Sequence, residues 1–247
     1  MDPHIKSFAA HLSDFRKLLL HMLLCVVFGV VIATPFAPRV YQWLTGPFER
    51  SGLDVVLRVT EVGGGFSVFL RVSLWSGLLL SLPFLVVLLA AYLLPALYGV
   101  EKQWIWKLGG ASCALFLLGS WMAYNWTVPV ALRFMVRVED WMQTPAIFWE
   151  VTSYIRFVIR LLLAFGMAFQ LPVLVVMLGS AGLVTVSQLR AGRCYAITAL
   201  FFLAMLMTPP DPFTMVLMAV PLVLLYEITI VILQAIVGAD KKAGVQD

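Results

Sequence analysis

Long stretches without a charged side chain are the feature that most constrains how this 247-residue chain can fold. Uncharged runs cover residues 18–38, 72–100, 108–132, 161–189 and 194–210, and residues 212–239 carry one charge, at Glu227. A helix that crosses a membrane needs about 20 apolar residues, so these runs predict six membrane-spanning helices. A transmembrane β-barrel is excluded, because the runs do not alternate between apolar and polar residues.

The composition excludes most soluble folds. Apolar residues make up 62% of the chain and charged residues 12%, whereas soluble domains carry about 25% charged residues. We expect a single all-α integral membrane domain over residues 1–247. Its six spans are predicted at about 18–37, 67–92, 106–128, 157–180, 194–207 and 213–237.

The distribution of lysine predicts the orientation. All six lysines fall on the side of the two termini, and basic residues favour the cytoplasmic side of a membrane. We therefore expect cytoplasmic termini, with an amphipathic segment at residues 1–17 before the first span and a tail at residues 238–247. The long segments at residues 39–65 and 129–156 are then periplasmic and cap the bundle, the second as short amphipathic helices.

The end of the chain predicts unusually short spans. Residues 194–207 are 14 in number and rise about 21 Å, which is less than a hydrocarbon core of about 30 Å. We expect the fifth and sixth helices both to be short. Glu227 lies 14 residues after 213, so it should be level with the end of the fifth helix that is farthest from the proline turn.

Few residues suit metal or enzyme chemistry. The three cysteines each lie inside an apolar run, and the three histidines lie within the first 21 residues without ligand spacing. We expect no metal, no cofactor and no enzymatic activity. The formal net charge of +4 marks membrane flanks rather than a nucleic-acid surface.

Four motifs along the chain carry a resemblance to a known family. They are His11-Leu-Ser-Asp-Phe-Arg-Lys17, Leu94-Pro-Ala-Leu-Tyr-Gly-Val-Glu-Lys102, Ala164-Phe-Gly-Met-Ala-Phe-Gln-Leu-Pro172, and Thr208-Pro-Pro-Asp-Pro-Phe-Thr214 with the later Leu225-Tyr-Glu227. In order and spacing they resemble the TatC family, the multi-spanning component of the twin-arginine translocase.

The resemblance implies a function that composition does not show. It implies a core receptor for twin-arginine signal peptides in the bacterial inner membrane, which supports export of folded proteins by the proton-motive force. It also implies partners of the TatA and TatB type and assembly into an oligomer. The alternative from the residues alone is a small six-helix secondary transporter or channel. Transporters often contain inverted repeats, and the chain shows no second copy of its proline-rich turn.

Two carboxylates are the candidates for recognising paired arginines. Each guanidinium can form a bidentate, charge-assisted pair with a carboxylate, and Asp14 and Glu101 lie on the cytoplasmic side in the predicted topology. The alternative is that both are ordinary solvated charges. With the motif residues that the resemblance adds, the predicted signal-peptide site comprises Asp14, Arg16, Pro95, Tyr98 and Glu101. Asp14 departs from the family's glutamate by one methylene.

Two polar residues inside the predicted spans are candidates for contacts with partner helices. Gln170 stands where the family commonly has glutamate, and it either joins two helices of this chain by a hydrogen bond or contacts a signal peptide or partner helix. Glu227 is the remaining intramembrane acid. It either pairs with a partner subunit, stays neutral with a raised pKa, or snorkels at a thinned membrane rim.

Five further positions are expected to serve the fold. Pro209, Pro210 and Asp211 form a structural turn before the last helix, where Asp211 caps the helix. Pro47 and Phe66 resemble family positions in the first periplasmic loop.

Overall fold

Helices dominate the computed structural model, which describes residues 3–52, 55–93, 102–144, 148–180, 182–207 and 212–243. In chain order the helices are α1 (Pro3–Ala33), α2 (Ala37–Arg50), α3 (Gly64–Leu93), α4 (Lys102–Met122), α5 (Val128–Trp141), α6 (Val151–Ala168), α7 (Leu171–Ser180), α8 (Val186–Ala191), α9 (Arg193–Met207) and α10 (Pro212–Ala243). The all-α expectation is confirmed. Five described helical stretches are long and apolar enough to cross a membrane, and Arg193–Leu206 forms a shorter apolar helix.

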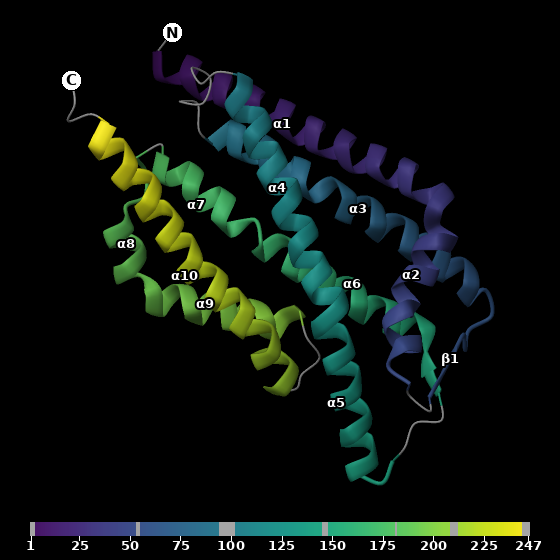
Figure 1. Ribbon diagram of the computed structural model, residues 1–247. Helices are drawn as coiled ribbons and strands as arrows, with labels where there is room; N and C mark the ends of the chain where they lie inside the picture. The colour runs from purple at the N-terminus through teal and green to yellow at the C-terminus, as the bar shows by residue number, and fades with distance from the viewer. Residues whose placement is uncertain are drawn as a thin grey trace.

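The bundle has two distinct ends. The beginning of α1 and the end of α10 lie at one end, which we name the terminal end (Figure 1). The opposite end, which we name the capping end, contains α2, the far part of α5, and the strands β1 (Val56–Arg58) and β2 (Phe148–Glu150). The termini therefore lie on the same side of the bundle, as an even number of crossings requires.

Helix α1 is continuous from Pro3 to Ala33. Residues 4–28 contain neither proline nor glycine, so nothing in them interrupts the helix. The amphipathic segment at residues 1–17 is thus largely the first part of the first membrane helix and not a separate element. A 3₁₀ turn, η1 (Thr34–Phe36), which contains Pro35, then joins α1 to α2.

The second capping segment departs from its expected form. A π-helical turn, η3 (Ala123–Thr127), connects α4 directly to α5, so the two form one rod that projects to the capping end (Figure 1). Pro129 stands in the first turn of α5, where the missing proline N–H costs little. The prediction that this segment consists of separate short helices is wrong for residues 129–141.

The fourth span breaks near its centre. It begins at Val151 rather than at the predicted 157, and the helix is interrupted at Phe169 and Gln170 before α7 begins at Leu171. Pro172 has no N–H to donate to the carbonyl of Ala168, and this explains the position of the break.

The last two helices differ in length. Helix α9 has 15 residues, which confirms the short fifth helix. Helix α10 has 32 residues, so the prediction of a short sixth helix is wrong. Pro221 lies within α10 without ending it, and a proline inside a membrane helix is tolerated where neighbouring groups satisfy the freed carbonyl.

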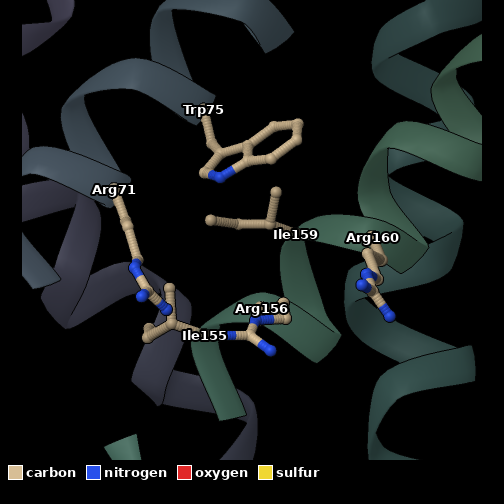
Figure 2. Close-up of a pocket in the computed structure, with 6 residues that line it drawn as sticks. All are labelled: Arg71, Trp75, Ile155, Arg156, Ile159 and Arg160. Atoms are coloured by element: carbon tan, nitrogen blue, oxygen red, sulfur yellow. The ribbon is translucent and has the colours of Figure 1, made fainter. Parts of the chain in front are cut away.

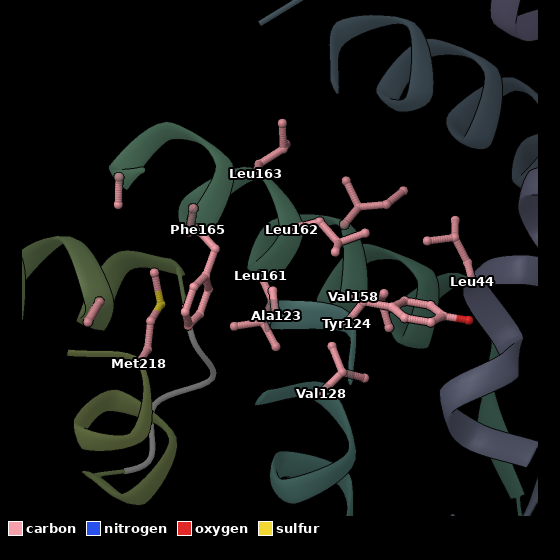
Figure 3. Packing of buried hydrophobic residues seen from close by; sticks show 14 of the residues in the cluster. Leu44, Ala123, Tyr124, Val128, Val158, Leu161, Leu162, Leu163, Phe165 and Met218 are labelled. Atoms are coloured by element: carbon pink, nitrogen blue, oxygen red, sulfur yellow. The ribbon is translucent and has the colours of Figure 1, made fainter. Parts of the chain in front are cut away.

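The core of the bundle is built around α6. In the span that contains α6 and α7, 67% of the most apolar window is buried, against 17% for the first span. Figure 3 shows Leu161, Leu162 and Phe165 of α6 among residues from α2, η3, α5 and α10. Because α1 packs mainly along α3, most of its apolar surface remains exposed to lipid.

A two-stranded parallel sheet joins the two capping segments. Val56, Leu57 and Arg58 of β1 pair with Phe148, Trp149 and Glu150 of β2. Strands of three residues are too short to show a recognisable alternation of apolar and polar residues, and the sequence analysis did not predict them.

Candidate functional site

At the terminal end, α1 contacts the last turn of α3. The Phe15 ring of α1 contacts the Tyr92 ring of α3, with ring centroids 6.1 Å apart and an interplanar angle of 52°. Asp14 precedes Phe15 in α1, while α3 ends at Leu93 and α4 begins at Lys102. Pro95, Tyr98 and Glu101 follow Tyr92 in the chain, between the end of α3 and the start of α4.

The structure describes only part of the predicted signal-peptide site. Arg16 is exposed on α1, and the backbone of Asp14 is helical. The side chain of Asp14 and all of Pro95, Tyr98 and Glu101 lie outside the described residues. Their roles stay predictions.

Close packing joins α1 and α3 between Cys25 and Val30 of α1 and between Gly77 and Ser81 of α3. A Cβ atom added at Gly77 would lie 2.5 Å from the backbone nitrogen of Val30, and one added at Gly29 would lie 2.6 Å from the carbonyl oxygen of Gly77. The Ser81 hydroxyl lies 3.1 Å from the carbonyl oxygen of Cys25 in α1 and 2.8 Å from that of Gly77 in α3. Small residues at such a crossing allow two membrane helices to approach closely.

Gln170 is held in the centre of the bundle by one residue of α4. The Ser112 hydroxyl donates to Gln170 Oε1 at 2.5 Å, and Gln170 Nε2 donates to the Ser112 carbonyl oxygen at 3.0 Å. Gln170 is 1% exposed. These bonds are the ones expected if Gln170 joins two helices of this chain, because both ends of the amide are occupied from within. A contact with another chain stays a prediction.

Packing between aromatic rings and glycines surrounds this amide. Phe169 precedes Gln170 and its ring lies against Gly119 of α4, while the ring of Phe116 on α4 lies against Gly166 of α6. Each helix thus inserts a ring where the other has no side chain. This reciprocal packing was not predicted from the sequence, although Gly119 and Gly166 indicate positions where another helix can approach closely.

Glu227 has a partner within the chain. Arg193 Nη2 lies 2.7 Å from Glu227 Oε2, and the two side chains are 46% and 39% exposed. Arg193 is the first residue of α9, so Glu227 is level with the end of α9 farthest from the proline turn, as expected. The sequence analysis did not consider this ion pair. At this exposure it contributes little stability, and Glu227 remains accessible to a partner helix.

The predicted turn and capping residues differ in what the structure describes. Pro209, Pro210 and Asp211 lie outside the described residues. Pro47 lies buried inside α2. Phe66 lies in the first turn of α3, with 66% of its surface exposed.

Helix α2 is anchored by tyrosines that the sequence analysis did not single out. Tyr154 of α6 donates to the carbonyl oxygen of Leu44 at 2.8 Å, and Tyr124 of η3 donates to that of Trp43 at 2.5 Å. The rings of Trp43 and Tyr124 stack, with centroids 4.0 Å apart, and Arg50 Nη2 donates to the Tyr124 hydroxyl at 2.8 Å. These contacts fix the capping segment to the core and do not form a reactive site.

Comparisons with known proteins agree with the arrangement of the motifs. Residues 10–221 match the model of the family described as Sec-independent protein translocase protein (TatC). The chain is 30% identical over 240 residues to the Sec-independent protein translocase protein TatC of Haemophilus influenzae, covering 96% of this chain and 92% of that protein. It is 34% identical over 220 residues to the TatC of Aquifex aeolicus, covering 89% of this chain and 91% of that one.

Solved structures share the fold. A crystal structure of the twin arginine translocase receptor TatC superposes with a TM-score of 0.79 at 33% identity, covering 91% of this chain and 98% of that chain. A second crystal structure of that receptor, in DDM, gives a TM-score of 0.81 at 33% identity, with 90% and 98% covered.

Proposed function

Since the chain belongs to the TatC family of Sec-independent protein translocase proteins, we propose that its terminal end is the surface that binds twin-arginine signal peptides. The chain is a multi-pass membrane protein and a component of a protein transport system. The motifs and the family membership support this function over the six-helix transporter that composition alone left open.

The contact between Phe15 and Tyr92 carries the proposal. It brings Phe15 of α1 next to Tyr92, near the end of α3. The carboxylates at positions 14 and 101 lie one residue before Phe15 and nine residues after Tyr92 in the chain, which supports placing them at one end of the bundle. Two nearby carboxylates suit two consecutive guanidinium groups, because each carboxylate can accept two parallel N–H bonds. Arg16, Pro95 and Tyr98 belong to the same two segments.

We assign the remaining features of the system by the same reasoning. The terminal end faces the cytoplasm of a bacterial cell, in whose inner membrane the protein lies. Glu227, exposed beside Arg193, is available for a polar residue of a TatA- or TatB-type helix. Such single-span subunits would supply the oligomeric complex, and the proton-motive force would supply the energy for export.

Photo-crosslinking tests the binding surface. A twin-arginine signal peptide that carries a photoreactive group next to its arginine pair is irradiated with membranes that contain the full chain. We expect Asp14→Ala and Glu101→Ala each to reduce the crosslinked product about tenfold, since a hydrogen bond to a charged group is worth about 1.5–3 kcal/mol.

The matched control removes a carboxylate from the other end of the bundle. Glu61 is exposed at the start of α3, and Glu61→Ala should leave the crosslinking unchanged. A peptide with paired lysines in place of arginines should crosslink weakly to every variant. Undiminished crosslinking in both Asp14→Ala and Glu101→Ala would overturn the assignment.

A further inference from the structure

Three arginines meet in a pocket between α3 and α6 that the proposed function does not use. The pocket has a volume of about 310 Å³ and is lined by Arg71 and Trp75 of α3 and by Ile155, Arg156, Ile159 and Arg160 of α6. We name it the arginine pocket. Figure 2 shows the three guanidinium groups along its lower edge, with Trp75 and Ile159 above them.

The arginines lie close to the boundary between headgroups and hydrocarbon. Arg71 is about 10 Å along α3 from Gly64, and Arg156 and Arg160 are about 8 and 14 Å along α6 from Val151, at 1.5 Å per residue. Helix α3, with 30 residues, is about 45 Å long, which matches a bilayer including both headgroup layers. The guanidinium groups therefore sit near the phosphates of the leaflet at the capping end.

No acidic residue that the structure describes lines this pocket. Among the described residues, Arg50, Arg190 and Arg193 form side-chain hydrogen bonds or ion pairs. Arg71, Arg156 and Arg160 form none within the part of the chain that the structure describes. Three positive charges that line one pocket, with no counterion among the described residues, favour an anionic ligand there.

The walls of the pocket select among anions. Trp75 is half-buried, and Ile155 and Ile159 are 1% and 3% exposed, so the inner part of the pocket is apolar. A ligand that fills it presents an anionic group toward the capping end and a hydrocarbon group toward the centre of the membrane. Guanidinium groups bind phosphate oxygens in a bidentate manner.

We propose that the arginine pocket binds the phosphate group of an anionic phospholipid of the surrounding leaflet. The lipid phosphate accepts hydrogen bonds from Arg71, Arg156 and Arg160, and the first part of an acyl chain lies against Trp75 and Ile159. The lipid would hold α3 and α6 together just below the β1–β2 sheet. This inference concerns the end of the bundle opposite the signal-peptide surface and does not depend on that assignment.

Native mass spectrometry of the full chain in detergent tests the proposal. The probes are dioleoyl-phosphatidylglycerol and dioleoylglycerol, which share acyl chains but differ in the phosphate. We expect phosphatidylglycerol to bind and the triple variant R71Q/R156Q/R160Q to lose this binding by at least about tenfold, from the loss of charge-assisted hydrogen bonds. R71K/R156K/R160K keeps the charge and should retain part of the binding.

A charge-matched control separates the pocket from general attraction. R39Q/R133Q/R137Q removes three arginines that do not line the arginine pocket, and its affinity for phosphatidylglycerol should stay within about twofold of the wild type. Thermal unfolding of each variant shows whether it is folded. An equal loss in both triple variants, or equal binding of dioleoylglycerol and phosphatidylglycerol, would overturn the proposal.

Two further arms identify the source of the anion. Inorganic phosphate in excess should not displace the lipid, because the apolar wall of the pocket contributes to lipid binding. Displacement would show that the pocket binds free phosphate and would overturn the lipid proposal. If R71Q/R156Q/R160Q binds lipid normally but loses a co-purified protein, the pocket is a protein contact and the lipid proposal is wrong.

Discussion

At the scale of single residues, the polar side chains within the helices differ in how deeply they are buried and in which partners they have. Gln170 and Ser112 form two hydrogen bonds with each other at the centre of the bundle, and the Ser112 hydroxyl also lies 3.2 Å from the Pro83 carbonyl oxygen. Glu227 is only loosely held by an exposed arginine. The Ser73 and Ser120 hydroxyls are buried and have no hydrogen-bond partner among the described residues. The same residue type can therefore contribute very differently at positions that look alike in sequence.

Ser112 and Ser120, both buried in α4, allow a direct comparison. Ser112→Ala leaves Gln170 Oε1 without its donor, so we expect a loss of about 1–3 kcal/mol in unfolding free energy. Ser120→Ala removes a hydroxyl that has no partner and should be neutral. Unfolding in detergent by a chemical denaturant measures both.

The double variant Ser112→Ala with Gln170→Leu supplies the control. Replacing both partners of a buried hydrogen bond by apolar groups is often close to neutral, so the double variant should recover part of the stability that Ser112→Ala loses. Equal stability of Ser112→Ala and Ser120→Ala would show that the bond to Gln170 contributes nothing.

At the scale of secondary-structure elements, glycine and aromatic positions decide which helices touch. Helix α1 approaches α3 where Gly29 faces Gly77, and α4 approaches α6 where Gly119 and Gly166 each receive a ring. The apolar residues of these helices face lipid as readily as protein, so hydrophobicity alone does not select neighbours. Neighbouring helices are selected by the positions at which two backbones can approach closely.

A glycine substitution in α3 tests this packing. The Cβ atom of Gly77→Ala would overlap the backbone of Val30, and we expect a loss of about 1–3 kcal/mol because a packed interface resists added volume. A thermal unfolding scan in detergent would show a lower midpoint. Gly110→Ala in α4 is the matched control, since nothing lies within 4 Å of its added Cβ.

Gly110→Ala should leave the midpoint unchanged or raise it slightly, because alanine favours a helix over glycine by about 1 kcal/mol. If the two substitutions behave alike, the approach of α1 to α3 does not depend on Gly77.

At the scale of the whole molecule, the bundle has a polar region at each end and an apolar middle. The terminal end contains the start of α1, the end of α3 and the start of α4, and the capping end contains α2, the far part of α5 and the β1–β2 sheet (Figure 1). Lysine distribution predicts that the terminal end faces the cytoplasm.

Thiol labelling tests this orientation in whole cells. In a background without Cys25, Cys113 and Cys194, a membrane-impermeant maleimide should label Glu61→Cys in intact cells and Ser13→Cys only after permeabilisation. Both positions are exposed, at opposite ends of the bundle. Labelling of Ser13→Cys in intact cells would show that the orientation is the opposite of the predicted one.

Prediction from sequence succeeded where a property depends on runs of residues. The number of spans follows from the lengths of the uncharged runs, and the short fifth helix follows from the prolines that begin at residue 209. The prediction of a short sixth helix was wrong, because α10 continues past Glu227 to Ala243 with no proline after Pro221 to end it. The interruption of the helix at Gln170 was not predicted, although Pro172 indicates a distortion there. A proline can either kink a helix or interrupt it, and the neighbouring residues do not distinguish the two outcomes.

The sequence by itself determined that this is a helical membrane protein and to which family it belongs. The lengths of the uncharged runs and the order of the motifs can both be read directly along the chain. Only the tertiary structure decided what individual polar groups do. It paired Gln170 with Ser112, gave Glu227 an arginine partner and gathered Arg71, Arg156 and Arg160 into one pocket. These partners are separated by between 4 and 89 positions in the sequence, and only helix packing through a few close contacts brings them together.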